Sequence, residues 1–230
     1  MITHAQVLGA LSGVRDPELD EPLTDLGFVA GITIDEDDVA VRLRLPTYFC
    51  APNFAYLMVD DARAAVRSLD GAGDVRVELG DHFASEEIND AVQDERGFGG
   101  AFPDETEGGL ESLRTLFQRK AFAARQGRLC EELLAAGREL SELAAMRLAD
   151  LPAGADRDRC VELRTTLGLP VGEDAPAFVL PQRGRVDAAG LDRYLRITRL
   201  IRVSLEGNAG LCRSLLHTRY GADVPEKVAA

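Results

Sequence analysis

The chain has 230 residues, of which 46% are hydrophobic and 28% are charged, which is typical of a folded protein with one large domain or two modest ones. Its formal net charge of −13 argues against a general nucleic-acid binder, because phosphates would be repelled by most of this surface. No apolar run is long enough to span a membrane, and the N-terminus lacks the basic region and cleavage site of a signal peptide.

The first part of the chain predicts a compact α/β unit. Apolar residues recur at helical spacing in two segments and alternate in three others, which indicates two helices and three strands. We expect the helices at 4–12 and 54–69, and the strands at 28–34, 39–45 and 75–79. Thr3 and Asn53 are the expected N-caps, and Ala30 is expected on the buried side of its strand.

A connector is expected at residues 84–109. It contains a short helix capped by Ser85 and then a stretch rich in Gly and Pro, which Phe98 and Phe102 would anchor. From residue 110 onward the pattern is helical. Helices are expected in 110–137, 138–151, 156–167, 188–205 and 208–219.

The predicted fold class is therefore α+β. A small N-terminal α/β domain with a three-stranded sheet and two helices (1–83) is followed by the connector (84–109). A mostly helical domain or extension (110–230) completes the chain.

The four cysteines, at positions 50, 130, 160 and 212, are too few and too scattered for a disulfide scaffold, and none forms a CxxC pair. A reducing compartment, the cytoplasm, is therefore expected. The segment LRLPTYFCAPN (43–53) places Cys50 between a strand and a helix. Helix amides and the helix dipole favour a thiolate at such a position, whereas the alternative is a small residue that fills a corner of the core.

The order of motifs resembles one known family. It consists of DPEL at 16–19, DLGFV at 25–29, two strands, the cysteine loop, a helix and VRVEL at 75–79. This order is similar to that of the SufT/PaaD-like metal–sulfur cluster assembly domain family over about residues 5–80, a third of the chain. The resemblance implies a small α/β domain that delivers iron–sulfur clusters or matures metal enzymes together with partner proteins. One branch of the family accompanies a di-iron oxygenase.

The resemblance also implies the site residues. Asp16 and Glu18 match the acidic DPE motif, and Cys50 matches the loop cysteine. The chain departs from the family where Pro46 replaces a usual threonine, which leaves Thr47 as the nearest hydroxyl. It departs again where Ala51 separates Cys50 from Pro52, since proline usually follows the cysteine directly.

Cys50, Asp16, Glu18 and Thr47 are thus the candidate residues for binding iron or a cluster transiently, and Cys50 and His82 are the candidate metal ligands. Each has a structural alternative. Asp16 is equally well explained as a cap of a turn, and His82 as a surface histidine. The carboxylates that follow, of Glu86, Glu87 and Asp90, are better explained as a solvated helix face.

The remaining cysteines are expected to be packing residues. Cys212 and His217 lie about 140° apart around a helix, so one metal ion could not easily take both. A row of arginines recurs every third residue at 193, 196, 199 and 202. Ion pairs within the protein are the default explanation of this row, and docking of a partner is the alternative.

Three functions follow, in this order. The first is a non-enzymatic accessory protein for cluster assembly or metalloenzyme maturation that uses Cys50 as a transient ligand. The second is a metal-free adaptor or chaperone. The third is a thiol enzyme with Cys50 as nucleophile. Such an enzyme needs a general base close to Cys50, and the sequence offers none nearer than His82. The expected partners are a client metalloenzyme or other cluster-assembly proteins. Because one cysteine cannot saturate a cluster, a homodimer, His82 or an external thiol is expected to supply further ligands.

Overall fold

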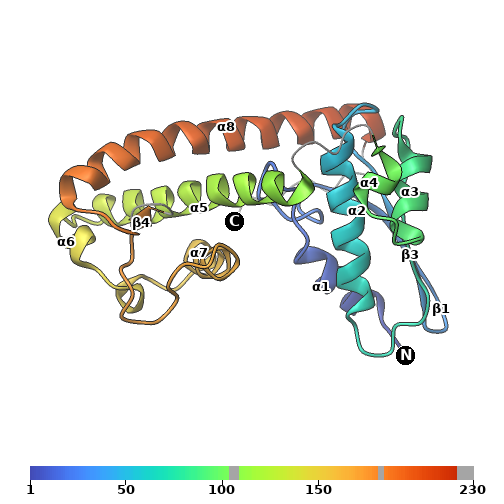
Figure 1. Ribbon diagram of the computed structural model, residues 1–230, viewed down its shortest axis with the longest axis horizontal. Helices are drawn as coiled ribbons and strands as arrows, with labels where there is room; N and C mark the ends of the chain where they lie inside the picture. The colour runs from blue at the N-terminus through green and yellow to red at the C-terminus, as the bar shows by residue number, and fades with distance from the viewer. Residues whose placement is uncertain (104–108, 181–183, 222–230) are drawn as a thin grey trace. The chain divides into compact units, whose positions relative to one another are not determined.

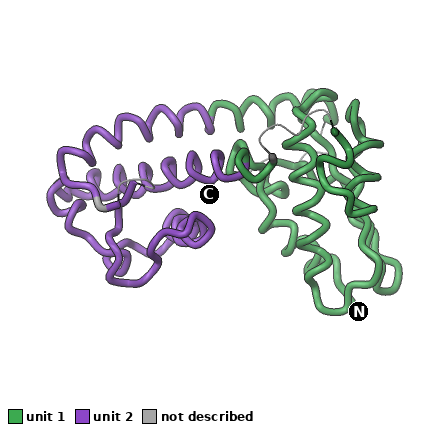
Figure 2. Tube along the Cα trace, viewed as in Figure 1, with its two compact units in different colours: residues 1–113, 207–230 green, residues 114–206 purple. Residues whose placement is uncertain are grey.

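The computed structural model describes residues 1–103, 109–180 and 184–221. It divides the chain into two compact units, which are shown in Figure 2. Unit 1 comprises residues 1–113 and 207–230, and unit 2 comprises residues 114–206. Two long helices, α5 (Gly109–Ala135) and α8 (Ala188–Tyr220), each contribute residues to both units.

Unit 1 is built on a three-stranded mixed sheet of β1 (Val29–Asp35), β2 (Asp38–Leu43) and β3 (Val75–Leu79) in that order. β1 pairs antiparallel and β3 parallel to the central strand β2, and the buried and exposed residues of β2 alternate as expected. In β1 the register shifts between Val29 and Gly31, so Ala30 is exposed and its predicted burial is wrong. A bulge of this kind adds a residue to one strand and breaks the alternation.

Three helices flank this sheet, α1 (His4–Ser12), α2 (Pro52–Arg67) and α3 (Ser85–Gln93), as Figure 1 shows. Thr3 caps α1 in a capping box with Gln6, as predicted.

The predicted caps of the next two helices are wrong. α2 starts at Pro52 with Ala51 at its N-cap, and α3 starts at Ser85 with Ala84 at its N-cap, so Asn53 and Ser85 lie inside the helices. Proline is pre-organised for the first helical position, which places the start of α2 ahead of Asn53.

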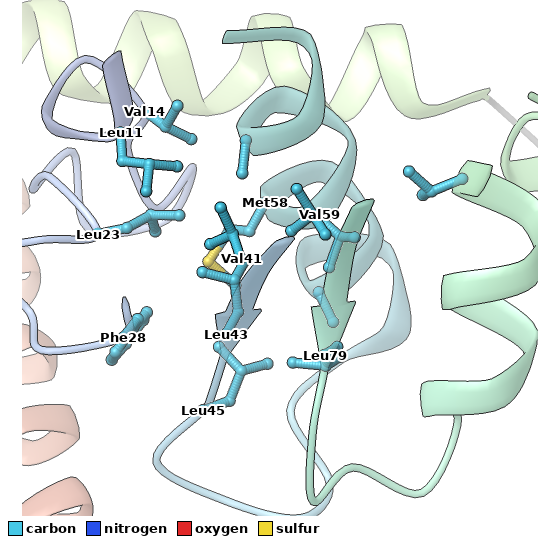
Figure 3. Close-up of a cluster of buried hydrophobic side chains, with 14 of the residues drawn as sticks. Leu11, Val14, Leu23, Phe28, Val41, Leu43, Leu45, Met58, Val59 and Leu79 are labelled. Carbon is cyan, nitrogen blue, oxygen red and sulfur yellow. The ribbon is translucent and has the colours of Figure 1, made fainter. Parts of the chain in front are cut away.

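The core of unit 1 joins helices, strands and loops. Figure 3 shows Leu11 and Val14 near the end of α1, Val41 and Leu43 on β2, and Met58 and Val59 on α2 among the buried side chains. Ala209 and Leu216 of α8 belong to the same core, with 1% and 0% of their surface exposed. The part of α8 from residue 207 onward therefore belongs to the α/β unit.

The predicted connector packs on unit 1 as far as it is described. In the short helix α4 (Phe98–Ala101), the Phe98 ring lies 5.6 Å from that of Tyr56 and 5.0 Å from that of Phe102. Residues 104–108 of the predicted connector lie outside the described residues, as do 181–183 and 222–230 of the predicted helical region. The compact units thus run across the domain limits expected from the sequence.

Unit 2 is mostly helical, which confirms the predicted fold class of a small α/β domain with a three-stranded sheet followed by a mostly helical region. Besides parts of α5 and α8 it contains α6 (Leu140–Ala145), a 3-10 helix (Leu148–Asp150), α7 (Ala155–Thr166), and the paired strands β4 (Val179–Leu180) and β5 (Gly184–Arg185). α8 is continuous where two helices were expected. A glycine inside a helix costs only about 1 kcal/mol, so Gly207 does not interrupt a helix with buried residues beyond it.

Cys130 and Cys160 are fully buried in the core of unit 2, in agreement with their expected packing role. Burial is the largest cause of a strongly raised pKa at Cys130, and Cys160 adds to it. Arg164 is also buried there, and its guanidinium donates to the carbonyls of Pro170 at 3.0 Å and Pro176 at 2.9 Å.

Three members of the arginine row form ion pairs within the chain. Arg199 lies 3.1 Å from Glu131 of α5, and Arg202 pairs with the same carboxylate. Arg196 pairs with Asp192 one turn earlier on α8. These contacts favour the intramolecular explanation of the row, while docking of a partner through it stays a prediction.

Candidate cysteine site

Cys50 lies at the end of the loop that joins β2 to α2. The loop begins after Leu43, buries Pro46 and ends at Ala51, the N-cap of α2. The Cys50 side chain is half-buried, and the Thr47 hydroxyl lies 3.4 Å from its sulfur, placed to donate a hydrogen bond. The sequence singled out Thr47 as the hydroxyl nearest to the position where the family usually has a threonine, and the structure places this hydroxyl against the sulfur.

His82 supports this loop through the backbone. Its Nε2 donates to the Cys50 carbonyl at 2.8 Å, because Nδ1 accepts from the Ala84 amide at 3.2 Å and so carries no proton. The side chain is only 3% exposed, so the expectation of a surface histidine is wrong. Burial lowers the pKa of His82, which keeps the ring neutral near pH 7. As a metal ligand it would have to give up one of these two hydrogen bonds.

The DPE motif forms a tight turn on the other side of the site. Oδ1 of Asp16 accepts from the amides of Glu18 at 2.8 Å and Leu19 at 2.9 Å, which is the capping role expected of an aspartate in such a turn. Asp16 is 8% exposed, and this burial raises its pKa to about 6 even though the two amide hydrogen bonds act in the opposite direction. The Asp16 carboxyl therefore lies in an environment with little access to water.

The last turns of α8 tie these loops together. Arg219 donates to the carbonyls of Leu45 at 3.1 Å and Asp81 at 2.7 Å, and so joins the cysteine loop to the loop that carries His82. Arg213 lies 2.6 Å from Glu21, just after the DPE turn. The sequence patterns did not connect α8 with the site.

A cavity of about 190 Å³ lies where these segments meet. Asp16, Glu18, Cys50 and Cys212 contribute its chemically active side chains. The apolar part of its wall includes Leu19, Phe28, Leu45, Phe54 and Met58. The structure thus brings together the candidates Asp16, Glu18 and Cys50, and adds Cys212 of α8.

Cys212 is the residue that sequence reasoning missed. Its spacing from Ala209 and Leu216, three and four residues away, places it on the buried face of α8, and this pattern was readable in the sequence. Which partner that face meets was not readable. Burial raises the pKa of Cys212 to about 12, and Asp16, Cys50 and Glu18 add to the effect.

The residues as they stand do not form a finished metal site. Within the described part of the chain, no group of three Cys, His, Asp or Glu side chains has an arrangement that could hold a metal ion. The cavity therefore offers soft and anionic donors, but a bound metal would need a ligand from outside or a side-chain rearrangement.

The family match covers the segment that carries Cys50 and the DPE turn. A family model described as "iron-sulfur cluster assembly protein" matches residues 4–79, from α1 to the end of β3. An uncharacterized protein of Methanocaldococcus jannaschii is 30% identical over 95 residues, which is 41% of this chain and 98% of that protein. The chain belongs to the iron–sulfur cluster assembly family. No solved structure matches it.

The match locates this assembly domain within the structure and confirms the resemblance seen in the sequence. The matched residues contain Asp16, Glu18, Thr47 and Cys50, whereas Cys212 lies outside them. The cavity is thus formed by the assembly domain and by a helix that the family model does not cover. None of the helices in the described ranges is both long and apolar enough to cross a membrane.

Proposed function

We propose that the protein is an accessory factor and not an enzyme, and that it binds iron or an iron–sulfur cluster transiently through Cys50 before passing it to a client metalloenzyme. The observation that carries the proposal is the placement of Cys50, half-buried on the wall of a cavity that also contains Asp16 and Glu18. Membership of the cluster assembly family supports a role in cluster assembly.

The chemistry of the cavity suits such a cargo. A thiolate is a soft ligand of the kind that iron–sulfur clusters use. The Thr47 hydroxyl would stabilise the thiolate by donating to the sulfur, and the apolar wall limits access of water. One thiolate leaves most coordination positions of the metal open, which favours release to a client.

A thiol enzyme is less well supported. Nucleophilic catalysis needs a base within hydrogen-bond distance of the sulfur. His82 is close to Cys50, but its ring nitrogens bond the Cys50 carbonyl and the Ala84 amide, so neither is free to take the proton of the thiol. A metal-free adaptor, in which Cys50 is a packing residue, remains the second candidate.

Exposed aromatic rings beside Cys50 provide a surface for the client. Tyr48 is 53% exposed, Phe49 75% and Phe83 49%, and the rings of Tyr48 and Phe83 lie 6.3 Å apart. Aromatic side chains are enriched at the centres of protein interfaces. We propose that the client, with a di-iron oxygenase as one candidate, covers these rings while it receives the cargo from Cys50.

Replacing Cys50 tests the function. The protein is loaded anaerobically with Fe²⁺ and sulfide and mixed with an apo-ferredoxin, and cluster transfer is followed by absorbance. Cys50→Ser should abolish transfer and keep the free energy of unfolding within about 1 kcal/mol of the parent, because the side chain is half-buried.

The matched control is Cys160→Ala, which removes a thiol from the core of unit 2 and should leave transfer intact. If Cys50→Ser transfers the cluster as the parent does, Cys50 is a packing residue and the adaptor function takes first place.

A further inference from the structure

Two cysteines from distant parts of the chain line one cavity. Cys50 comes from the β2–α2 loop and Cys212 from α8, and both side chains are half-buried. Asp16 and Glu18 line the same cavity. A pair of thiols beside two carboxylates differs from a single cysteine because it can chelate.

Cys212 is held in place on both sides along its helix. Ala209 and Leu216 are buried in the core of unit 1, one turn before and one turn after Cys212. Arg213 pairs with Glu21 at 2.6 Å, and Arg219 bonds the Leu45 carbonyl at the base of the cysteine loop. The position of the second sulfur is thus determined by packing and ion pairs, as a ligand position requires.

The charges around the cavity favour a cation. Asp16 and Glu18 supply oxygen donors and the two cysteines supply sulfur donors around one cavity. A bound cation would offset the electrostatic cost of ionising them. Metal binding can therefore displace the thiol protons.

We propose that Cys212 is the second thiolate ligand of the Cys50 site, so that the two sulfurs together bind one thiophilic metal ion, either free Fe²⁺ or an iron atom of a cluster. The inference rests on the proposed function and extends it. Binding releases one proton from each thiol to solvent and involves no change of oxidation state.

Two ligands from the chain leave the coordination of the metal ion incomplete. A tetrahedral metal ion with two protein thiolates has two further positions for water, a small-molecule thiol or a client side chain. Since closed four-ligand sites are structural and open ones exchange ligands, the arrangement fits a carrier that must release its cargo.

Anaerobic titration with Co²⁺ tests the inference without any assay of a client. Thiolate–cobalt charge-transfer absorption reports how many sulfurs bind each ion. It should fall by about half per bound ion in both Cys50→Ser and Cys212→Ser, with affinity weakened by about tenfold or more, and it should vanish in the double variant. X-ray absorption of the unmutated Co²⁺ form should show two sulfur neighbours.

Two control variants accompany the titration. Ser214→Ala, on the exposed face of the same helix, and Cys160→Ala, in unit 2, should both bind Co²⁺ like the parent. Circular dichroism and a urea midpoint establish that each variant is folded, and Cys212→Ala replaces the serine variant if serine unfolds the protein.

The outcomes separate the two proposals. If Cys212→Ser binds Co²⁺ with parental absorption and affinity while Cys50→Ser loses cluster transfer, the proposed function stands and the role of Cys212 is refuted. One sulfur neighbour in the unmutated Co²⁺ form refutes it as well. If Cys50→Ser transfers clusters normally, the proposed function fails regardless of what Cys212 binds.

Discussion

Short polar contacts organise the cysteine site at the scale of single residues. Thr47 approaches the Cys50 sulfur, His82 donates to the Cys50 carbonyl, and Asp16 bonds two amides of its own turn. His82 and Asp16 thereby provide hydrogen-bond partners to backbone groups of the cysteine loop and of the DPE turn. The burial of Asp16 has a cost that can be measured.

The cost of burying Asp16 should appear in the pH dependence of stability. Its pKa in the folded protein, about 6, lies above the ordinary value of 3.8. Its contribution to stability is therefore complete below pH 3.8 and is lost as the pH rises through about 6. Asp16→Asn keeps the oxygen that accepts from Glu18 and Leu19 but never ionises.

We therefore expect Asp16→Asn to gain stability over the parent between pH 4 and pH 7, reaching roughly 2–3 kcal/mol at pH 7. Urea unfolding at several pH values measures this difference. A difference that stays constant with pH would show that Asp16 is not desolvated in the folded protein.

At the scale of secondary-structure elements, the C-terminal part of α8 contributes both polar contacts and core packing to unit 1. Its charged residues bond the Leu45 and Asp81 carbonyls and Glu21, and its apolar residues enter the core. If α8 contributed no packing to unit 1, truncating its side chains there would not change stability. Comparing a buried with an exposed leucine of α8 therefore tests its role.

Leu216→Ala should lower the free energy of unfolding by about 2–4 kcal/mol, because Leu216 is 0% exposed in the core of unit 1 and its loss leaves a cavity. Leu211→Ala is the matched control on the same helix. Leu211 is 58% exposed, and its replacement should change stability by less than about 0.5 kcal/mol. Equal effects in urea unfolding would contradict the packing of Leu216 in the core of unit 1.

At the scale of the whole molecule, the two compact units do not simply follow one another along the chain. Unit 1 takes residues from both ends of the chain, and unit 2 is inserted between them. The segment 84–103, predicted to be part of a connector, belongs to unit 1. Its helix α3 buries Ile88, Ala91 and Val92, each with no more than 1% exposed surface.

Hydrogen exchange tests this assignment. The amides of α3 should exchange about as slowly as those of α2, because buried helices of one cooperative unit open together. The exposed residues of α7, which belongs to unit 2, provide a reference for exchange in the other unit in the same experiment. If α3 exchanges at the earliest times while α2 stays protected, then 84–103 is a separate connector, as predicted from the sequence.

The sequence by itself determined the local features of this protein. Alternation along β2, the Thr3 cap of α1 and the position of Cys50 before a helix each depend on residues that are close together in the chain. Periodicity and capping report such local preferences directly. The order of motifs from DPEL to VRVEL was by itself sufficient to recognise the family.

Tertiary structure alone decided which distant segments meet. The burial of His82, the continuity of α8 through Gly207 and the arrival of Cys212 beside Cys50 depend on packing between parts of the chain that are far apart in sequence. Helical periodicity shows that Cys212 faces a core, but it carries no information about which core. The sequence therefore placed the second thiol of the site on the packed face of a helix, and only the fold made it a candidate ligand.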